Sequence, residues 1–332
     1  MSLSWGGPGA IPHRYRIGKA QFVREFGVEV VETAHALRDP EWLARNPAAR
    51  AADVMEAFAD PSIDGIISTI GGSESMRLLP HLRQEVITEN PKVFLGYSDT
   101  TVSHLVCFRA GLVSFYGPAF MAGFAENGGM FPYMVESVRR TCFSAAPIGV
   151  IAPCRDGWTV EHLEWTNPAN QDRRRSLSPS TGWRFLQGTG IAQGPLIGGC
   201  LEVLDWLRGT PGWPDASAFD QAILFLETSE SAAPPAAVAH TLRSYAAMGI
   251  LKRLSGILFG RPGGSVPVDQ FPKYDEAILQ VVAEEEGLTD LPIVTRMDFG
   301  HTDPMFVLPY GVMAQIDSGR QEFAILESAV VE

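Results

Sequence analysis

The sequence has no run of about 18 consecutive apolar residues, the length that a helix needs to cross a membrane. Its first residues also lack the charged and then apolar pattern of a secretory signal peptide. Cysteines are few, and the four that occur, Cys107, Cys142, Cys154 and Cys200, show no C-x-x-C spacing, which argues against a zinc knuckle or a disulfide framework. These absences predict a cytoplasmic protein without a membrane partner.

Positive charge is scarce relative to negative charge. With 26 Lys and Arg against 38 Asp and Glu, the formal net charge is -12 and the isoelectric point is about 5.1. Because an acidic surface repels nucleic acid polymers and anionic membranes, neither is expected as a partner. A small peptide or another small molecule is the expected substrate. The length of 332 residues, 45% of them hydrophobic, suggests two domains with a large core.

Predicted strands alternate with predicted helices, at the spacing of a parallel sheet in an α/β protein. In such sheets, ligands bind beyond the carboxyl ends of the strands. Residues 194–200 are predicted to open a helix that carries Leu201, Leu204 and Leu207 on one face. The predicted strands are residues 3–5, 28–31, 63–70, 93–95, 222–226, 256–259 and 291–295, followed by a hairpin of residues 312–316 and 323–326.

Ser98 lies at a sharp turn between strand 93–95 and a helix predicted over residues 100–110. A serine at such a turn projects its hydroxyl above the edge of the sheet, beside the first N–H groups of the helix. The match to the G-x-S-x-G nucleophile motif is partial, because Gly96 is present but Thr100 replaces the second glycine. A plain turn in which Ser98 or Asp99 caps the helix is the simpler explanation of the local pattern alone.

Gly71 and Gly72 follow the predicted strand 63–70. Glycines at this place let backbone N–H groups approach a substrate closely, and such donors can stabilise a developing oxyanion. A tight turn without a catalytic role explains the same pair equally well.

The chain offers one acid and one base at other strand ends. Ser98, Glu227 and His301 occur in the order serine, acid, histidine that α/β-hydrolases use. A serine nucleophile needs a base to accept its proton and a carboxylate to orient that base. A metal site formed by Asp298, His301 and Asp303 is an alternative, but no second histidine is nearby and the H-E-x-x-H spacing is missing, so we predict neither a metal nor a cofactor.

A polar stretch, residues 161–190, separates a predicted N-terminal domain, residues 1–160, from a C-terminal domain, residues 191–332. The stretch contains Trp165, Trp183 and three consecutive arginines, residues 173–175. The arginines could contact an anionic group and the tryptophans could stack on a ring. A solvated interdomain loop with aromatic anchors explains the same composition.

Six short motifs follow one another along the chain: residues 70–72, 96–101, 117–119, 194–199, 224–227 and 298–304. Together they make the chain resemble the LD-carboxypeptidase family of serine peptidases. The resemblance implies a Rossmann-like N-terminal domain, a smaller swivelling-type α/β C-terminal domain and a homodimer. It also implies a triad of Ser98 as nucleophile, Glu227 and His301, with oxyanion donors from the backbone of Asp99 and of Gly71–Gly72.

Two branches of this family differ in substrate. One removes the terminal D-alanine of murein tetrapeptides, and the other, similar to the microcin C immunity protein, cuts the amide of peptidyl or aminoacyl nucleotides. The loop 161–190 resembles the second branch, which implies that Trp183, or else Trp165, stacks on a nucleobase while Arg184 contacts a phosphate or sulfamate. Cys200 departs from the family pattern, because asparagine is common at that position.

The sequence therefore predicts a metal-independent serine hydrolase that acts on peptidyl or aminoacyl nucleotides, with murein tetrapeptide cleavage as the alternative. A nucleotide-binding module that has lost catalysis is a rival, which the presence of Ser98, Glu227 and His301 disfavours. A glutamine amidotransferase-like enzyme would need a cysteine in place of Ser98.

Overall fold

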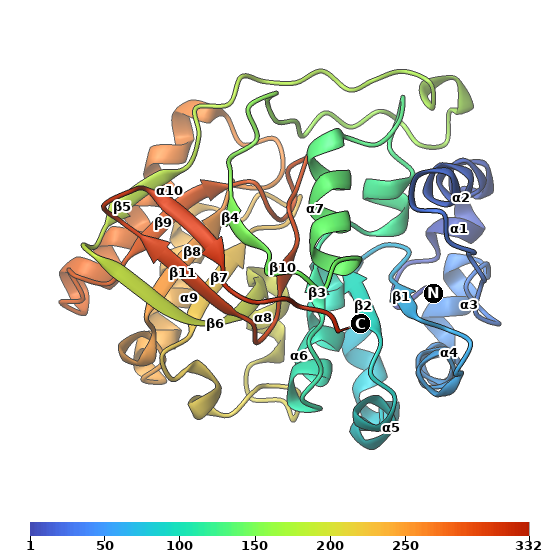
Figure 1. Ribbon diagram of the computed structural model, residues 1–332, viewed down its shortest axis with the longest axis horizontal. Helices are drawn as coiled ribbons and strands as arrows, with labels where there is room; N and C mark the ends of the chain where they lie inside the picture. The colour runs from blue at the N-terminus through green and yellow to red at the C-terminus, as the bar shows by residue number, and fades with distance from the viewer. Residues whose placement is uncertain (332) are drawn as a thin grey trace. The chain divides into compact units, whose positions relative to one another are not determined.

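Figure 1 shows the computed structural model, which describes residues 1–331. The chain forms two compact units, each assembled from separated stretches of sequence. The predicted interdomain loop, residues 161–190, is divided between the two units after Leu177. Unit 1 consists of Met1–Phe143, Glu161–Leu177 and Pro304–Leu308; unit 2 consists of Ser144–Val160, Ser178–Asp303 and the chain from Pro309 onward.

A four-stranded sheet organises unit 1, in the order β1 (Gly65–Ile67), β2 (Val93–Gly96), β3 (Phe115–Tyr116) and β10 (Leu308–Pro309). The first three strands are parallel, so the parallel sheet predicted for the N-terminal region is confirmed. Phe94 on β2 is fully buried and packs in one cluster with Phe58 and Leu78. This packed cluster therefore holds the carboxyl end of β2 in place.

The helices of unit 1 mostly begin at a proline, which already has the backbone angle of a first helical residue. Helix α2 ends at Gly27, which adopts the left-handed conformation typical of a helix end. The helices are α1 (Gly7–Ala10), α2 (Pro12–Phe26), α3 (Pro40–Arg45), α4 (Pro47–Ala59), α5 (Gln84–Glu89), α6 (Thr101–Arg109) and α7 (Pro132–Cys142). Shorter turns are η1 (Ser75–His81), η2 (Ser98–Thr100), η3 (Phe120–Phe124) and η4 (Pro168–Asn170).

Two strands predicted near the N-terminus are wrong. Residues 28–31 form no strand, and Val31 is 57% exposed, so this segment has neither a paired backbone nor a buried face. Residues 3–5 make a bend instead, where the N–H of Trp5 donates to the carbonyl of Gly71 at 3.2 Å. A single bond of this kind holds the chain beside the Gly71 loop without forming a ladder.

An eight-stranded sheet organises unit 2, and its centre is the parallel run β6-β7-β8-β9. Every residue of β7 and β8 is buried, as expected for parallel strands covered on both faces. The order is β4 (Gly149–Ile151), β12 (Glu322–Ile325), β11 (Met313–Asp317), β6 (Ile191–Cys200), β7 (Ile223–Glu227), β8 (Gly256–Gly260), β9 (Ile293–Met297) and β5 (Arg184–Gln187).

Strand β6 joins the parallel and antiparallel parts of this sheet. Its first half pairs antiparallel with β11 and its second half pairs parallel with β7. The prediction that residues 194–200 open a helix is therefore wrong, because two neighbours hold them as a strand; the helix starts at Leu201. The predicted C-terminal hairpin is confirmed as the antiparallel pair β11–β12.

The helices of unit 2 connect its strands, and α9 and α10 pack against each other. Among the described residues, no helix combines the length and the hydropathy needed to span a membrane. The helices are α8 (Leu201–Leu207), α9 (Pro235–Ala247) and α10 (Phe271–Leu279), with shorter turns η5 (Ala216–Phe219), η6 (Leu251–Arg253), η7 (Val268–Gln270) and η8 (Gln280–Glu285).

Candidate active site

The first group of candidate residues lies at the serine turn, residues 96–99, between β2 and α6. Ser98 adopts a backbone φ of +62°, a left-handed conformation that a non-glycine residue rarely takes. Its N–H donates to the Tyr116 hydroxyl at 3.1 Å, and its carbonyl accepts a hydrogen bond from the Thr101 hydroxyl at 2.7 Å. Strain of this kind persists only where the surroundings enforce it, and it is characteristic of nucleophile turns.

The buried side chain of His104 is bonded to the backbone of this turn. His104 contacts the carbonyl of Gly96 through Nε2 and the hydroxyl of Ser114 through Nδ1, both at 2.8 Å. Burial lowers the pKa of the His104 imidazole to about 4, so the ring is neutral at pH 7. His104 therefore stabilises the turn without adding charge to it.

Gly71 lies directly against Ser98, as the predicted oxyanion loop requires. A Cβ atom added at Gly71 would lie 2.9 Å from the Ser98 Oγ and 3.4 Å from the Asp99 backbone nitrogen. The Asp99 carboxylate accepts the N–H groups of Glu74 and Ser75 at 3.0 and 2.9 Å, which fixes the loop to the serine turn. Unit 1 thus brings together three of the predicted residues: Ser98, Gly71 and Asp99.

Gly72 has a different neighbour. Its φ is +142°, and an added Cβ would lie 2.4 Å from the Oγ of Ser4. That hydroxyl also accepts the N–H of Glu74 at 3.0 Å. Gly72 thus packs beside the N-terminal bend and shapes the loop in which Gly71 faces Ser98.

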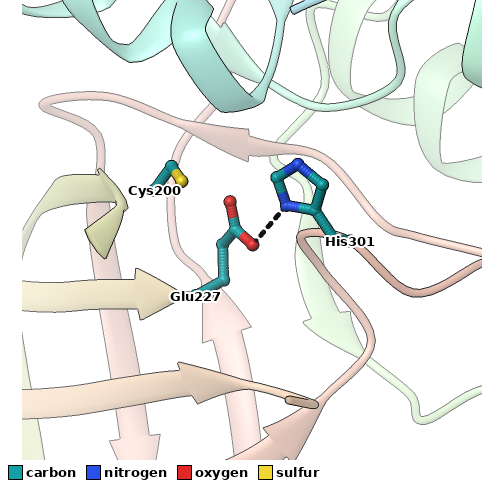
Figure 2. A group of neighbouring side chains, drawn as sticks. All are labelled: Cys200, Glu227 and His301. Atoms are coloured by element: carbon teal, nitrogen blue, oxygen red, sulfur yellow. Dashed lines mark hydrogen bonds and ion pairs between the residues drawn. The ribbon is translucent and has the colours of Figure 1, made fainter. Parts of the chain in front are cut away.

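The second group lies in unit 2, where Glu227 and His301 form what we call the acid–base pair. Glu227 is the last residue of β7 and is fully buried, and its Oε2 accepts a hydrogen bond from His301 Nδ1 at 2.7 Å (Figure 2). Gly300, with a φ of +91°, makes the close approach possible, because an added Cβ would lie 2.6 Å from Glu227 Oε2. The bond leaves Nε2 as the nitrogen that can exchange a proton with another group.

Glu230, which the sequence analysis did not identify, contacts the other side of the imidazole. Its Oε2 lies 3.1 Å from His301 Nε2, although the Glu230 side chain is 79% exposed. Burial by itself lowers the pKa of His301, but the carboxylates of Glu227 and Glu230 outweigh burial and raise that pKa to about 10. The same contact lowers the pKa of Glu230 to about 2. The sequence signal that could have identified Glu230 was its position three residues after Glu227.

Cys200 also lies beside the acid–base pair. It ends β6 directly opposite Glu227 in the parallel register, and its thiol donates to Glu202 Oε2 at 3.3 Å. Burial, and then the carboxylates of Glu227 and Glu202, raise the pKa of this thiol well above its usual value. Figure 2 shows Cys200 and His301 on either side of the Glu227 carboxylate.

Asp298, a member of the alternative metal trio, has other partners. Its Oδ1 accepts from Arg261 at 2.7 Å, and its Oδ2 accepts from the backbone of Cys154 at 3.0 Å and from Trp183 Nε1 at 2.7 Å. Over residues 1–331, the group whose metal-ligating atoms lie within 4.8 Å of one another is Cys200, Glu227 and His301. That group does not include Asp298 or Asp303.

The predicted substrate-binding residues are held by the units they belong to. In unit 2, Trp183 is anchored by its bond to Asp298, and Arg184 pairs with Asp275 at 3.0 Å while its own side chain stays 53% exposed. In unit 1, the guanidinium of Arg14 lies 4.1 Å from the centre of the Trp165 ring. The hydrogen bond to Asp298 therefore fixes the edge of the Trp183 ring, whereas Arg14 covers one face of the Trp165 ring.

The arginines of the loop differ in their partners. Arg175, 11% exposed, forms a two-point ion pair with the buried Glu126, and Arg173 pairs with Glu161 at 3.2 Å. The Arg175–Glu126 pair holds the loop to the rest of unit 1, whereas the Arg173–Glu161 pair joins two positions within the loop.

Comparison with known families gives two matches that follow one another along the chain. Residues 1–117 match the LD-carboxypeptidase N-terminal domain. Residues 193–316 match the LD-carboxypeptidase C-terminal domain.

Individual relatives align over most of the chain. A Vibrio cholerae protein named "Putative carboxypeptidase" is 28% identical, with 95% of this chain and 90% of that protein covered. The microcin C7 self-immunity protein MccF of Escherichia coli is 28% identical, with 84% and 78% covered. A Bacillus subtilis protein named "Probable murein peptide carboxypeptidase" is 25% identical, with 94% and 86% covered.

Solved structures are similar as well. An MccF-like protein from Streptococcus pneumoniae in complex with AMP has a TM-score of 0.86 at 30% identity, covering 98% of this chain and 97% of that one. MccF in complex with aspartyl sulfamoyl adenosine has a TM-score of 0.83 at 26% identity, covering 100% and 96%.

Proposed function

Because the chain belongs to the LD-carboxypeptidase family, we propose that it is a serine hydrolase that cuts the amide of peptidyl or aminoacyl nucleotides. Ser98 is the nucleophile, His301 the general base and Glu227 its orienting partner. The observation that carries this proposal is the buried hydrogen bond of 2.7 Å between Glu227 and His301 Nδ1. A carboxylate in that position fixes the tautomer in which Nε2 accepts a proton.

The proposed reaction proceeds through an acyl-enzyme. The Ser98 hydroxyl oxygen bonds to the substrate carbonyl carbon while His301 Nε2 takes the hydroxyl proton. The backbone N–H groups of Asp99 and of the Gly71–Gly72 loop donate to the resulting oxyanion. His301 then gives its proton to the leaving nitrogen as the amide C–N bond breaks. In the second half of the reaction, His301 deprotonates a water molecule, which attacks the carbonyl carbon of the ester. The bond to the Ser98 oxygen breaks, His301 returns the proton to that oxygen, and the acid product leaves.

Two features support the nucleotide branch. The chain is similar over nearly its whole length to MccF-like structures, of which one is in complex with AMP and another with an aminoacyl sulfamoyl nucleoside. Trp183, our candidate for stacking on a nucleobase, is held at its indole nitrogen by Asp298 and is therefore pre-oriented. Trp165, the second candidate, already stacks against Arg14. Arg184 remains exposed enough to meet a phosphate or sulfamate.

Hydrolysis of aspartyl sulfamoyl adenosine and of an L,D-linked murein tetrapeptide, measured side by side, tests the proposal. We expect cleavage of the nucleoside compound, with a loss of roughly 10³-fold or more in the Ser98→Ala variant. Trp183→Ala is expected to raise KM for the nucleoside compound, with a smaller change in kcat. The matched control is Trp206→Ala, which removes a different indole of unit 2; Trp206 is 45% exposed. Equal activity of wild type and Ser98→Ala would refute the serine mechanism.

Cleavage of the tetrapeptide instead would support murein recycling, which the similarity to the Bacillus subtilis relative favours as the second candidate. Failure of both substrates, together with no labelling of Ser98 by a serine-directed phosphonate, would support a binding module without catalysis.

We further propose that the protein is a homodimer, as the family resemblance implies, and that it acts in the cytoplasm. All four cysteines are buried thiols in the structure, which suits a reducing compartment. Sedimentation at several protein concentrations tests the dimer, and a monomer at every concentration would refute it.

A further inference from the structure

Three side chains of different ligand chemistry meet at the carboxyl edge of the unit 2 sheet. A thiol from Cys200, a carboxylate from Glu227 and an imidazole from His301 place their ligand atoms within 4.8 Å of one another (Figure 2). Cys200 and Glu227 are opposite each other in the register of β6 and β7, so their backbones are fixed by the sheet. Ligands on rigid elements keep their geometry better than ligands on loops.

We propose that Cys200, Glu227 and His301 form a binding site for a thiophilic divalent cation such as Zn²⁺, and that occupation of this site inhibits the enzyme. Zinc accepts sulfur, nitrogen and oxygen ligands at bond lengths of roughly 2.0–2.3 Å, which puts tetrahedral ligand atoms about 3.5 Å apart. Binding therefore requires the three ligand atoms, which lie within 4.8 Å of one another, to close to that spacing. Three protein ligands leave the fourth position for water, as in open zinc sites.

The charges around the cluster favour a cation. Glu227 is itself a ligand, Glu202 contacts the Cys200 thiol at 3.3 Å, and Glu230 contacts His301 at 3.1 Å. A bound dication would be the largest charge in the site and would stabilise the thiolate form of Cys200.

A second layer of contacts holds the ligands in place. The Glu202 carboxylate accepts the backbone N–H of Ser229 at 3.0 Å and the Ser229 hydroxyl at 2.7 Å. It therefore keeps a fixed position beside Cys200 Sγ. Outer contacts of this type orient metal ligands and strengthen binding.

Binding replaces the thiol proton of Cys200 and the Nδ1 proton of His301 by the metal, and both protons leave to solvent. Thiolate and carboxylate together neutralise the dication, while the imidazole coordinates as a neutral ring. Because Nδ1 of His301 faces Glu227, coordination at Nδ1 leaves the remaining ring proton on Nε2. Nε2 can then no longer accept the proton of Ser98. This inhibition rests on the proposed function, whereas metal binding does not.

Titration of the metal-free protein with Co²⁺, followed by absorption spectroscopy, tests the site directly. Thiolate coordination produces a sulfur-to-cobalt charge-transfer band in the near ultraviolet, which a site of oxygen and nitrogen ligands lacks. We expect this band at one equivalent of Co²⁺, and we expect Zn²⁺ to remove it by displacement. Cys200→Ser is expected to abolish the band and weaken binding by roughly tenfold or more.

Cys154→Ser is the matched control, because it removes another buried thiol of unit 2, and the band should persist in it. The band should also persist in Ser98→Ala, which separates metal binding from catalysis. Absence of the band from the wild-type protein overturns the proposal without recourse to any variant. A band that survives in Cys200→Ser, or one that disappears in Cys154→Ser, also overturns the proposal.

Discussion

The serine turn and the acid–base pair hold their functional side chains by different physical means. At the serine turn, Ser98 is positioned by backbone strain and by neutral partners, the hydroxyls of Tyr116 and Thr101. In the acid–base pair, His301 is positioned by two carboxylates, of which Glu227 is fully buried. A change at the serine turn should therefore act through geometry, and a change at the acid–base pair should act through charge and depend on pH.

The largest effect is expected for Glu227→Gln, which preserves shape but removes the buried charge. Loss of the orienting carboxylate should lower kcat by roughly 10⁴-fold. The raised pKa of His301 means that its contribution to stability is complete below pH 6.5 and is lost as the pH rises toward about 10. In Glu227→Gln this decline should shrink, as chemical denaturation at several pH values would show. An unchanged decline would mean that Glu227 does not set the charge of His301.

Gly300→Ala tests whether the acid–base pair also depends on shape. The added Cβ would lie 2.6 Å from Glu227 Oε2 and would require a φ of +91°. We expect a loss of roughly 2–4 kcal/mol in the free energy of unfolding, together with lower activity. Gly287→Ala is the matched control, since Gly287 has a φ of +69° but no atom within 4 Å of the added Cβ. Equal losses in both variants would show that only the backbone angle matters.

Ser98→Gly tests the strain at the serine turn. Glycine adopts a φ of +62° without steric cost, so the variant should gain roughly 1 kcal/mol in the free energy of unfolding while losing hydrolysis. Ser98→Ala, which removes the same hydroxyl but keeps Cβ, should show no such gain. Calorimetric unfolding of the two variants makes the comparison, and identical stabilities would argue against strain.

The smallest effect is expected for Glu230→Gln, because this carboxylate is 79% exposed and water screens it. Removing its charge lowers the pKa of His301, so the acidic limb of the kcat/KM profile should move to lower pH by about half a unit. Glu85→Gln, an exposed change in unit 1, serves as the control for net charge. A shift toward higher pH would contradict the role assigned to Glu230.

Strong local patterns were predicted well. The predicted apolar strand that ends just before Glu227 is β7, and the predicted C-terminal hairpin is the pair β11–β12. Residues 194–200 were missed, because glycine and proline disfavour a strand locally and only the pairing of β6 with β7 and β11 overrides that preference.

The candidate site shows the same contrast between residues indicated by local patterns and residues brought together only by the fold. Residues at strand ends, such as Ser98 and Glu227, could be found because the fold class places strand ends at one edge. Glu230 was not identified, because its position three residues after Glu227 is a weak signal and its contact with His301 depends on the path of an exposed loop that no periodicity encodes.

The sheet of unit 2 also has a consequence for how the chain folds. Gly149 pairs with Ile325, and the first half of β6 pairs with β11, so strands far apart in sequence must meet before this sheet is complete. Loops of such length are entropically costly to close, and folding slows as contacts become less local. We therefore expect the antiparallel side of this sheet to form late in folding, when the hairpin β11–β12 docks against β6.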